Sequence, residues 1–421
     1  MKGGFTIIQT IVLVLKAAVL SHHSNMSLDF QSIRQQVQQL GETAVLRERE
    51  LDERRALALA ALESNSQDLD GLRQKVEGVV RNHDPALRCA MPVAEALMTA
   101  APLPEMPAEM TVLAADGSQI SPDRHAEVNF AVVNVGAILM RLGSGQAPTI
   151  TVASELLYDE QLYSETGTIS EESLALRRDR AERTILGDLA ESAEPPVMAL
   201  ADGPMELWGV KGGDRAARAD FQENLKLYQE ALVRLEKLNV ITGGYVDKPA
   251  ANLVVRALEI ALTPEADLAE IKKRHPLRGV TDISVFRDVL AVGERSAVFA
   301  IQSQSAKSYP GALKLHFFYL NVGQSGKPYV ARVEIPAWVA EETKKLDNLH
   351  AVLIDQCRVM GTRPYPYLLH RAHETAVVKR PEKEQVMTMI TQELRQRGVG
   401  VGVLSSKQSA KQADGRGRYG R

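Results

Sequence analysis

Cysteine is nearly absent from the 421-residue sequence, which contains only Cys89 and Cys357. Two cysteines cannot build a disulfide framework, and they exclude a zinc site made of several thiolates. A reducing cytoplasm keeps thiols unpaired, so this composition favours a cytoplasmic protein.

The sequence also lacks an excess of charge of either sign. It has 50 Lys and Arg against 53 Asp and Glu, which gives a formal net charge of −3. A protein that binds nucleic acid over a broad surface is usually strongly basic. Any DNA contact must therefore come from a local cluster of basic residues or from a lined cavity. The length allows one large domain with accessory elements, or two domains.

Two further patterns are missing: a P-loop and a long apolar segment. Without G-x-x-x-x-G-K-[ST], ATP hydrolysis by the P-loop route is not expected. The apolar stretch Thr6–Leu20 is shorter than the roughly 20 residues that a spanning helix needs, so we expect no membrane insertion. Residues 1–25 are an extension that fits an over-extended start before Met26, a weak signal peptide or a helix lying on a membrane.

The ends of the chain differ in composition from its middle. Residues 27–82 are rich in Gln, Glu, Arg, Leu and Ala and contain no proline, which predicts a long helix or helical hairpin. The proline-rich residues 84–109 are expected to form a linker, so residues 26–109 form a helical arm and linker. Residues 405–421 have few apolar side chains, which predicts a disordered basic tail.

Between residues 110 and 404, short apolar segments alternate with amphipathic ones. This mixture predicts an α/β domain built on a mixed sheet, with the charged residues 264–295 as an irregular insertion. The expected strands are residues 111–115, 128–140, 149–153, 197–201, 240–242, 297–301, 315–322 and 329–335. The expected helices are residues 171–192, 220–238, 252–262, 338–346 and 365–379, with residues 349–359 either helical or extended.

Two of the expected strands stop at an Asp-Gly pair, Asp116-Gly117 and Asp202-Gly203. Ligands in open α/β sheets collect at strand ends, and glycine lets the chain turn sharply there. If the two strands are neighbours, the two carboxylates can share hard cations such as Mn²⁺ or Mg²⁺. Asp-Gly is also a common turn pair, so each motif alone is explained as well by a turn.

Two divalent cations require more negative charge than two aspartates provide. Glu182 lies beside the apolar stripe of the helix expected at 171–192, where a carboxylate needs a partner. The competing interpretation is an i,i+4 ion pair with Arg178. Glu155, near the end of another apolar segment, is the alternative third ligand.

The C-terminal helix expected at 365–379 carries two candidate site residues. His373 falls on its apolar stripe and is expected to face inward, where a histidine is usually a hydrogen-bonded core residue. Tyr365 lies at the helix entrance, where its hydroxyl can orient a phosphate or a water.

Three basic residues are candidates for binding a phosphate group. Lys248 follows Gly243-Gly244, a pair that permits close backbone approach, and its ammonium group can meet a phosphate. Arg178 and Arg183 lie near Glu182 on the same expected helix. Helix solubility explains these arginines equally well.

Taken in order, the motifs between residues 111 and 378 resemble those of the NurA nuclease family. Each motif is short, but the ordered set is fairly specific. The motifs are ADGS at 115–118, LADG at 200–203, GGYVDKP at 243–249, FYLN at 318–321, ARVEIP at 331–336, YP at 365–366 and AH at 372–373.

The resemblance implies an RNase H-like core and roles for particular residues. Asp116 and Asp202 match metal-binding aspartates, and Glu182 is the best match for a helical glutamate ligand. Tyr365 and His373 match site residues, with His373 completing the metal shell or assisting proton transfer. Two Mn²⁺ or Mg²⁺ ions are implied.

The resemblance also implies activity and partners. The activity is 5′–3′ exonuclease and single-strand endonuclease cleavage of DNA, and the expected assembly is a homodimer docked on a hexameric HerA-type translocase. DNA end resection and repair follow, with defence against foreign DNA left open. The alternatives are a catalytically inactive adaptor for a motor ATPase and an aspartate-dyad hydrolase. The second is disfavoured because glycine follows each aspartate directly.

Overall fold

The computed structural model describes residues 28–123, 126, 128–164, 167–209 and 215–400. It divides into two compact units, Met1–Ala56 and Leu57–Arg421. The expected extension at 1–25 and the basic tail at 405–421 lie outside the described residues. The described part of the first unit is the start of helix α2 (Phe30–Ser64), which exposes apolar side chains such as Phe30, Val37 and Leu40.

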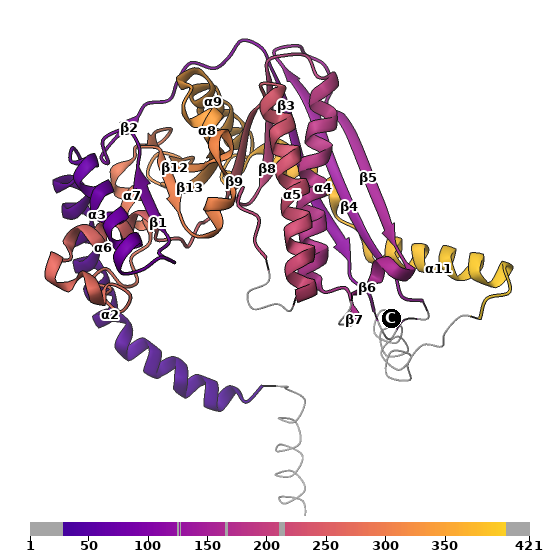
Figure 1. The fold of residues 1–421 in the computed structure, drawn as a ribbon, viewed down its shortest axis with the longest axis horizontal. Helices are drawn as coiled ribbons and strands as arrows, with labels where there is room; N and C mark the ends of the chain where they lie inside the picture. The colour runs from indigo at the N-terminus through magenta and orange to yellow at the C-terminus, as the bar shows by residue number, and fades with distance from the viewer. Residues whose placement is uncertain (1–27, 124–125, 127, 165–166, 210–214, 401–421) are drawn as a thin grey trace, which may run out of the picture. The chain divides into compact units, whose positions relative to one another are not determined.

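The second unit is a sheet of eleven strands with helices on both faces (Figure 1). Its strands are β1 (Cys89–Pro92), β2 (Ala100–Ala101), β3 (Met110–Ile120), β4 (Ala131–Leu142), β5 (Thr149–Leu157), β8 (Val197–Asp202), β9 (Ile241–Val246), β10 (Arg295–Ser296), β11 (Phe299–Gln302), β12 (Leu315–Asn321) and β13 (Val330–Pro336). A separate small hairpin joins β6 (Tyr163–Ser164) and β7 (Gly167–Thr168).

Helices occur before, between and after these strands along the chain. The α-helices are α3 (Leu69–Asn82), α4 (Glu171–Ser192), α5 (Arg215–Lys237), α6 (Leu253–Leu262), α7 (Asp282–Val289), α8 (Ala337–Ala340), α9 (Thr343–Val359), α10 (Tyr367–Ala376) and α11 (Arg380–Gln396). Short 3-10 turns are η1 (Asp159–Leu162), η2 (Glu265–Glu270), η3 (Ser305–Ser308) and η4 (Gly311–Leu313).

The strand order confirms the expected mixed sheet with an RNase H-like core. The order across the sheet is β1-β11-β12-β13-β9-β8-β3-β4-β5. Strands β3, β8 and β9 are parallel, while β4 and β5 continue from β3 as an antiparallel meander. When β3, β4, β5, β8 and β9 are numbered 1 to 5 in chain order, they lie in the spatial order 3-2-1-4-5. Helix α4 connects β5 to β8, and α5 connects β8 to β9.

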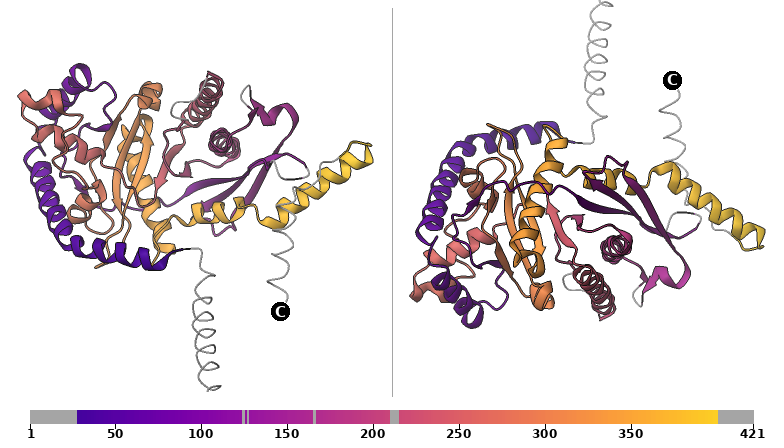
Figure 2. Two further views of the ribbon diagram at one scale, coloured as in Figure 1. Left: turned by 90° about the horizontal axis from the view of Figure 1, so that it is seen from below. Right: turned by 90° about the horizontal axis from the view of Figure 1, so that it is seen from above.

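Helices α4 and α10 cover opposite faces of this core (Figure 2). Gly136 pairs with Asp116, and Gly117 is the next residue of β3, so the two glycines face opposite sides of the sheet. A Cβ atom on Gly136 would contact α10, and one on Gly117 would contact α4. The larger apolar core lies on the α10 side. It joins β3, β8, β12 and β13 to α9 and α10 through buried residues such as Val112, Leu200 and Leu369.

Several expected strand boundaries were wrong, because pairing within the sheet extends the strands beyond the apolar segments from which they were predicted. Strand β3 does not stop at Asp116: it continues to Ile120, fully paired with β4. Residues Gly243–Val246 lie inside β9 instead of following it. The expected linker contributes β1 and β2, and β1 pairs with β11.

Helical elements also differ from the expectation. The supposedly irregular residues 264–295 contain η2, α7 and the start of β10. Residues 349–359 are the second half of α9, and Tyr365 precedes α10 instead of lying inside it. Among the described residues, no helix has the length and apolar character needed to cross a membrane.

Candidate active site

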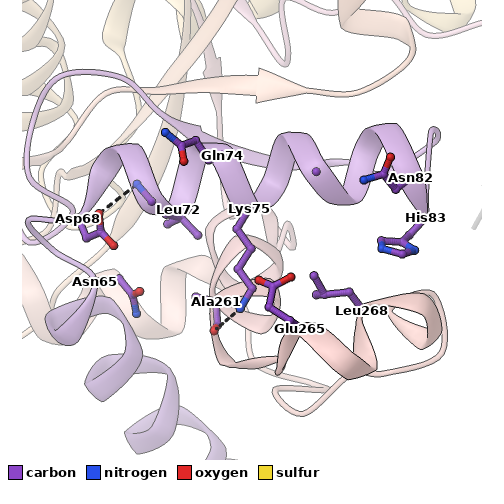
Figure 3. Close-up of a pocket in the computed structure, with 12 residues that line it drawn as sticks. Asn65, Asp68, Leu72, Gln74, Lys75, Asn82, His83, Ala261, Glu265 and Leu268 are labelled. Carbon is purple, nitrogen blue, oxygen red and sulfur yellow. Dashed lines mark hydrogen bonds between the residues drawn. The ribbon is translucent and has the colours of Figure 1, made fainter.

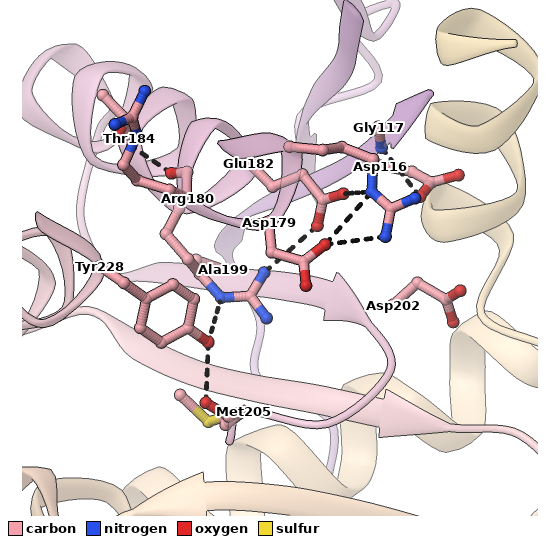
Figure 4. Close-up of polar contacts among 12 residues, drawn as sticks. Asp116, Gly117, Asp179, Arg180, Glu182, Thr184, Ala199, Asp202, Met205 and Tyr228 are labelled. Atoms are coloured by element: carbon pink, nitrogen blue, oxygen red, sulfur yellow. Dashed lines mark hydrogen bonds and ion pairs between the residues drawn. The ribbon is translucent and has the colours of Figure 1, made fainter. Parts of the chain in front are cut away.

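Asp116, Glu182 and Asp202 line one pocket of about 190 Å³ (Figure 4). They come from β3, α4 and β8. Strands β3 and β8 are parallel and neighbouring, with Ala115 opposite Ala201, so Asp116 and Asp202 occupy the next pair of positions. Neighbouring strands lie roughly 4.8 Å apart. The expectation that the two Asp-Gly strands are adjacent is therefore confirmed.

Gly117 allows α4 to approach the strand that carries Asp116. A Cβ atom at this position would lie 2.7 Å from Glu182 Oε1 and 2.4 Å from Arg178 Cγ. The strand does not turn here, so the glycine after Asp116 provides space for Glu182 instead of a bend. Gly203 differs, because its positive φ of 78° ends β8 in a conformation that favours glycine.

Glu182 is buried, with an exposed fraction of only 5%. Its oxygens lie 3.7 Å from Arg178 Nε and 3.7 Å from Arg183 Nη1, so the expected ion pair with Arg178 is present as well. Burial raises the pKa of Glu182 to about 8, and the nearby charges of Asp179 and Asp116 add to the rise. Five carboxylate side chains line the pocket, but only two arginines do.

Glu155, the alternative third ligand, lies elsewhere. It is exposed on β5 and lines a separate pocket that includes Arg180 and Thr184. Of the two glutamates, Glu182 is the one that shares a pocket with Asp116 and Asp202.

His373 is placed beside Asp116 by the packing of α10. Its Nδ1 lies 2.7 Å from Asp116 Oδ2, and its side chain is 61% exposed. The expectation that His373 faces inward was therefore wrong. The small buried residues Ala372 and Ala376 face the sheet instead, and the backbone at both residues comes within 2.8 Å of a Cβ built on Gly136.

Two side chains from the sheet fix the end of α10. Ser118 Oγ and Asn134 Nδ2 both donate to the carbonyl oxygen of Ala376, the latter at 2.7 Å. Ser118 belongs to the same ADGS motif as Asp116. The motif thus supplies an acidic group, space for Glu182 and an anchor for the helix that carries His373.

Tyr365 lies against the second aspartate. Its hydroxyl donates to Asp202 Oδ1 at 2.8 Å, and its ring packs edge-on against Tyr245 with 5.5 Å between centroids. Partial burial raises the pKa of Asp202, and the hydrogen bond from Tyr365 opposes that rise. Burial also raises the pKa of Tyr365, so the phenol keeps its proton and remains a donor.

The backbone of Met205, three residues after Asp202, is held by hydrogen bonds at its N–H and at its carbonyl. Its N–H donates to Glu334 Oε2 at 2.9 Å, and its carbonyl accepts from the Tyr228 hydroxyl at 2.8 Å. Tyr228 in turn accepts from Arg183 Nε at 3.1 Å. These buried groups fix the turn that follows β8.

This arrangement excludes helix solubility as the explanation for Arg183. The side chain is only 3% exposed, and its guanidinium group contacts Glu182 and Tyr228 inside the protein. It is therefore not on the outer surface of α4. Arg178 is half-buried and pairs with Asp179, whereas Lys248 is exposed at the end of β9 with Nζ 5.8 Å from the Tyr329 ring centroid.

The pocket is also lined by polar and aromatic residues that the sequence did not predict, among them Asp179, Glu206, Trp208 and Tyr228. Asp179 lies one helical turn before Glu182 and is half-buried, a spacing that a search for paired carboxylates would have found. Glu206 and Trp208 follow the Asp202 strand in irregular backbone, where no periodicity marks a site. A larger pocket of about 480 Å³ lies between α3 and α6, where Lys75 Nζ donates to the Ala261 carbonyl (Figure 3). It contains none of the expected site residues.

The donor chemistry of the active-site pocket fits a hard divalent cation. Carboxylate oxygens are the ligands that Mg²⁺ and Mn²⁺ prefer. Burial raises the pKa values of Glu182 and Asp202 because it disfavours their charged forms, and a bound cation would stabilise those forms. Within the described residues, no three acidic, histidine or cysteine side chains already form a metal cluster. The Asp116 carboxylate contacts His373, and the Glu182 carboxylate contacts Arg178 and Arg183. These contacts occupy carboxylate oxygens that a metal ion would otherwise bind.

Comparisons with solved structures return nucleases at low identity. The crystal structure of the NurA nuclease from Sulfolobus solfataricus has 12% identity and a TM-score of 0.46, with 71% of this chain and 88% of that chain covered. The catalytic domain of human Endonuclease V has 13% identity and a TM-score of 0.29, with 77% and 98% covered. LC9-RNase H1, a type 1 RNase H, has 17% identity and a TM-score of 0.21, with 35% and 67% covered.

The amino-acid sequence was also compared with curated proteins and with protein-family models. No curated protein sequence matches the chain. The family model of the NurA domain matches residues 110–378, which is more than half of the 421 residues and includes Asp116, Glu182, Asp202, Tyr365 and His373. The chain therefore belongs to the NurA family of nucleases.

Proposed function

We propose that this protein hydrolyses DNA phosphodiester bonds with two divalent cations, Mn²⁺ or Mg²⁺, held by Asp116, Glu182 and Asp202. The observation that carries the proposal is the register of β3 and β8, which gives Asp116 and Asp202 neighbouring positions at the same pocket as Glu182. Three carboxylates from three separate elements give the charge that a pair of cations needs.

The surrounding side chains have separate roles in this proposal. When bound, the cations would activate a water for in-line attack on phosphorus and stabilise the leaving 3′-oxygen. Tyr365 fixes the orientation of Asp202 through its hydrogen bond. His373 fixes Asp116 and, because its imidazole is largely exposed, is available to complete a ligand set or to transfer a proton at the leaving oxygen.

The proposed substrates are DNA ends, degraded 5′–3′, and single-stranded DNA. Family membership supports this assignment, and two basic side chains are available to contact the phosphates. Arg178 lies at the pocket itself, and Lys248 lies exposed beyond β9, the strand next to the one that ends at Asp202. With a net charge of −3, such local groups must make the contact.

The proposed assembly is a homodimer on a hexameric HerA-type translocase, acting in the cytoplasm in DNA end resection and repair. Strand β5 supports an interface, because within the described part of the chain it pairs only with β4, and it exposes the apolar side chains of Ile150, Val152 and Leu156. The free, buried Cys89 and Cys357 are compatible with a reducing compartment.

The direct test compares Asp116→Asn with Glu155→Gln as a control for loss of a carboxylate on the same sheet. End-labelled single-stranded and duplex DNA would be incubated with each protein in Mn²⁺, Mg²⁺ or EDTA, and thermal unfolding would establish folding. We expect no cleavage by Asp116→Asn, no cleavage in EDTA and normal cleavage by Glu155→Gln. A folded parent chain that binds the translocase but cleaves DNA in no divalent metal would instead establish the inactive-adaptor alternative.

A further inference from the structure

Trp208 is a large aromatic side chain placed at the active-site pocket. The sequence contains two tryptophans. Trp338 donates its Nε1–H to the carbonyl of Val240, whereas Trp208 is 47% exposed and lines the pocket together with Asp116 and Asp202. The exposed indole presents a large aromatic ring beside the carboxylates of the pocket.

The indole ring is backed by a cation that is itself anchored. The guanidinium carbon of Arg88 lies 4.7 Å from the centroid of the Trp208 ring. Arg88 Nη2 is 2.6 Å from Glu206 Oε2, and the Glu206 side chain is completely buried. Glu206 also accepts a hydrogen bond from Ser303 Oγ at 3.3 Å. The arginine beside the ring is thus held by a buried carboxylate and contributes a cation–π contact.

The backbone that leads to Trp208 is fixed although it forms no regular structure. The Met205 peptide is held by Glu334 and Tyr228, as described above, and the N–H of Leu207 donates to the buried Tyr309 hydroxyl at 2.8 Å. Contacts from β13, α5 and the turn before β12 therefore hold the backbone at Met205 and Leu207. The backbone that carries the exposed ring is thus held in place, which lowers the entropy that a ligand must remove on binding.

We propose that Trp208, backed by Arg88, is a stacking subsite for an unpaired nucleobase of the DNA strand that enters the pocket. Every base has a π face, so such a site binds single-stranded DNA without reading its sequence. A base inside a duplex is already stacked on its neighbours and is not available. The subsite therefore favours single strands and frayed ends. The inference rests on the proposed nuclease function, because it assumes that DNA enters this pocket.

The test measures binding apart from cleavage. Full-length parent, Trp208→Ala, Trp208→Phe and the control Trp338→Phe would be titrated against fluorescein-labelled oligothymidylate in EDTA, by anisotropy. Loss of a stacked base weakens binding roughly 5- to 100-fold, so we expect that loss in Trp208→Ala. Trp208→Phe and Trp338→Phe should stay close to the parent, and duplex binding should change little. Thermal unfolding establishes that each variant is folded.

A second readout follows the ring itself. In Trp338→Phe the only indole is Trp208, and its fluorescence should be quenched by oligothymidylate but not by an abasic oligomer of the same length. Equal affinity of the parent and Trp208→Ala for oligothymidylate would overturn the inference. If that variant instead lost binding to a hexameric translocase, the ring would be a protein-docking residue and the DNA assignment would be wrong.

The two proposals can fail separately. A chain whose cleavage of DNA depends on Asp116 but not on Trp208 keeps the nuclease function and loses the stacking subsite. A chain that binds no DNA in any condition contradicts both.

Discussion

Nδ1 of His373 lies within hydrogen-bond distance of Oδ2 of Asp116, at 2.7 Å, although 257 positions separate the two residues in the sequence. The contact forms because α10 packs on β3 and β4 through small residues, which leaves the histidine at the edge of the helix. The contact links α10, which carries the exposed imidazole, to β3, which carries Asp116.

Replacing His373 by alanine should reduce cleavage while leaving the fold intact, because the imidazole is exposed and contributes little to the core. General acid–base groups typically contribute about 10²- to 10⁴-fold to a rate, so a loss in kcat of that order is expected. The control is His370→Ala, since His370 lies on the same helix but pairs with Glu374. Single-turnover cleavage in Mn²⁺ measures the effect, and equal rates for the two variants would remove His373 from the mechanism.

Replacing Tyr365 by phenylalanine should shift the pH dependence of cleavage. The hydroxyl hydrogen bond lowers the pKa of Asp202, so its loss raises that pKa further. The carboxylate form is then reached only at higher pH, and the acidic limb of the kcat/KM profile should move to higher pH. Tyr329→Phe, which removes a hydrogen bond to Asp247, is the control. An unchanged acidic limb in Tyr365→Phe would contradict the role of this hydrogen bond.

The raised pKa of Glu182 predicts how the unfolding free energy of the metal-free protein depends on pH. Its folded pKa is raised from 4.5 to about 8, so the stability provided by the protonated carboxyl is fully present below pH 4.5 and is lost as pH rises through about 8. In EDTA, Glu182→Gln should therefore gain stability over the parent between about pH 5 and about pH 9. Urea unfolding at each pH gives the difference, with Glu155→Gln as the matched control.

Divalent metal should reverse that order. Binding of a cation stabilises the ionised carboxylate and releases its proton, so the parent should gain more stability from Mn²⁺ near pH 8 than Glu182→Gln does. Equal stabilisation of both proteins by Mn²⁺ would exclude Glu182 as a ligand.

Gly136 is expected to tolerate no side chain. A Cβ atom there would lie 2.6 Å from the backbone nitrogen of Ala376 and 2.8 Å from the carbonyl oxygen of Ala372, both in α10. Gly136→Ala should cost about 1–3 kcal/mol of unfolding free energy and displace His373, lowering activity. Gly78→Ala, on α3 with open space around it, should instead be neutral or stabilise by up to about 1 kcal/mol. Chemical unfolding and cleavage assays of both variants compare the two outcomes.

Local pattern was sufficient for most of the elements. The helix expected at 171–192 has the same ends in the structure, where Ser170 caps it and acidic residues occupy its first turn. The hairpin of β12 and β13 followed from two apolar segments around a glycine-containing turn. Strand ends were less predictable, because β3 continues past Asp116 only through pairing with residues of β4.

The amino-acid sequence by itself determined which chemical groups are available: two Asp-Gly motifs, a glutamate beside an apolar stripe, and a tyrosine and a histidine near the C-terminus. Only the tertiary structure decided which of them meet. Glu182 rather than Glu155 shares the pocket with the aspartates, His373 lies at the edge of α10, and Arg183 is buried. Such choices depend on strand register and helix packing between segments up to 257 positions apart, and local periodicity contains no information about contacts over that separation.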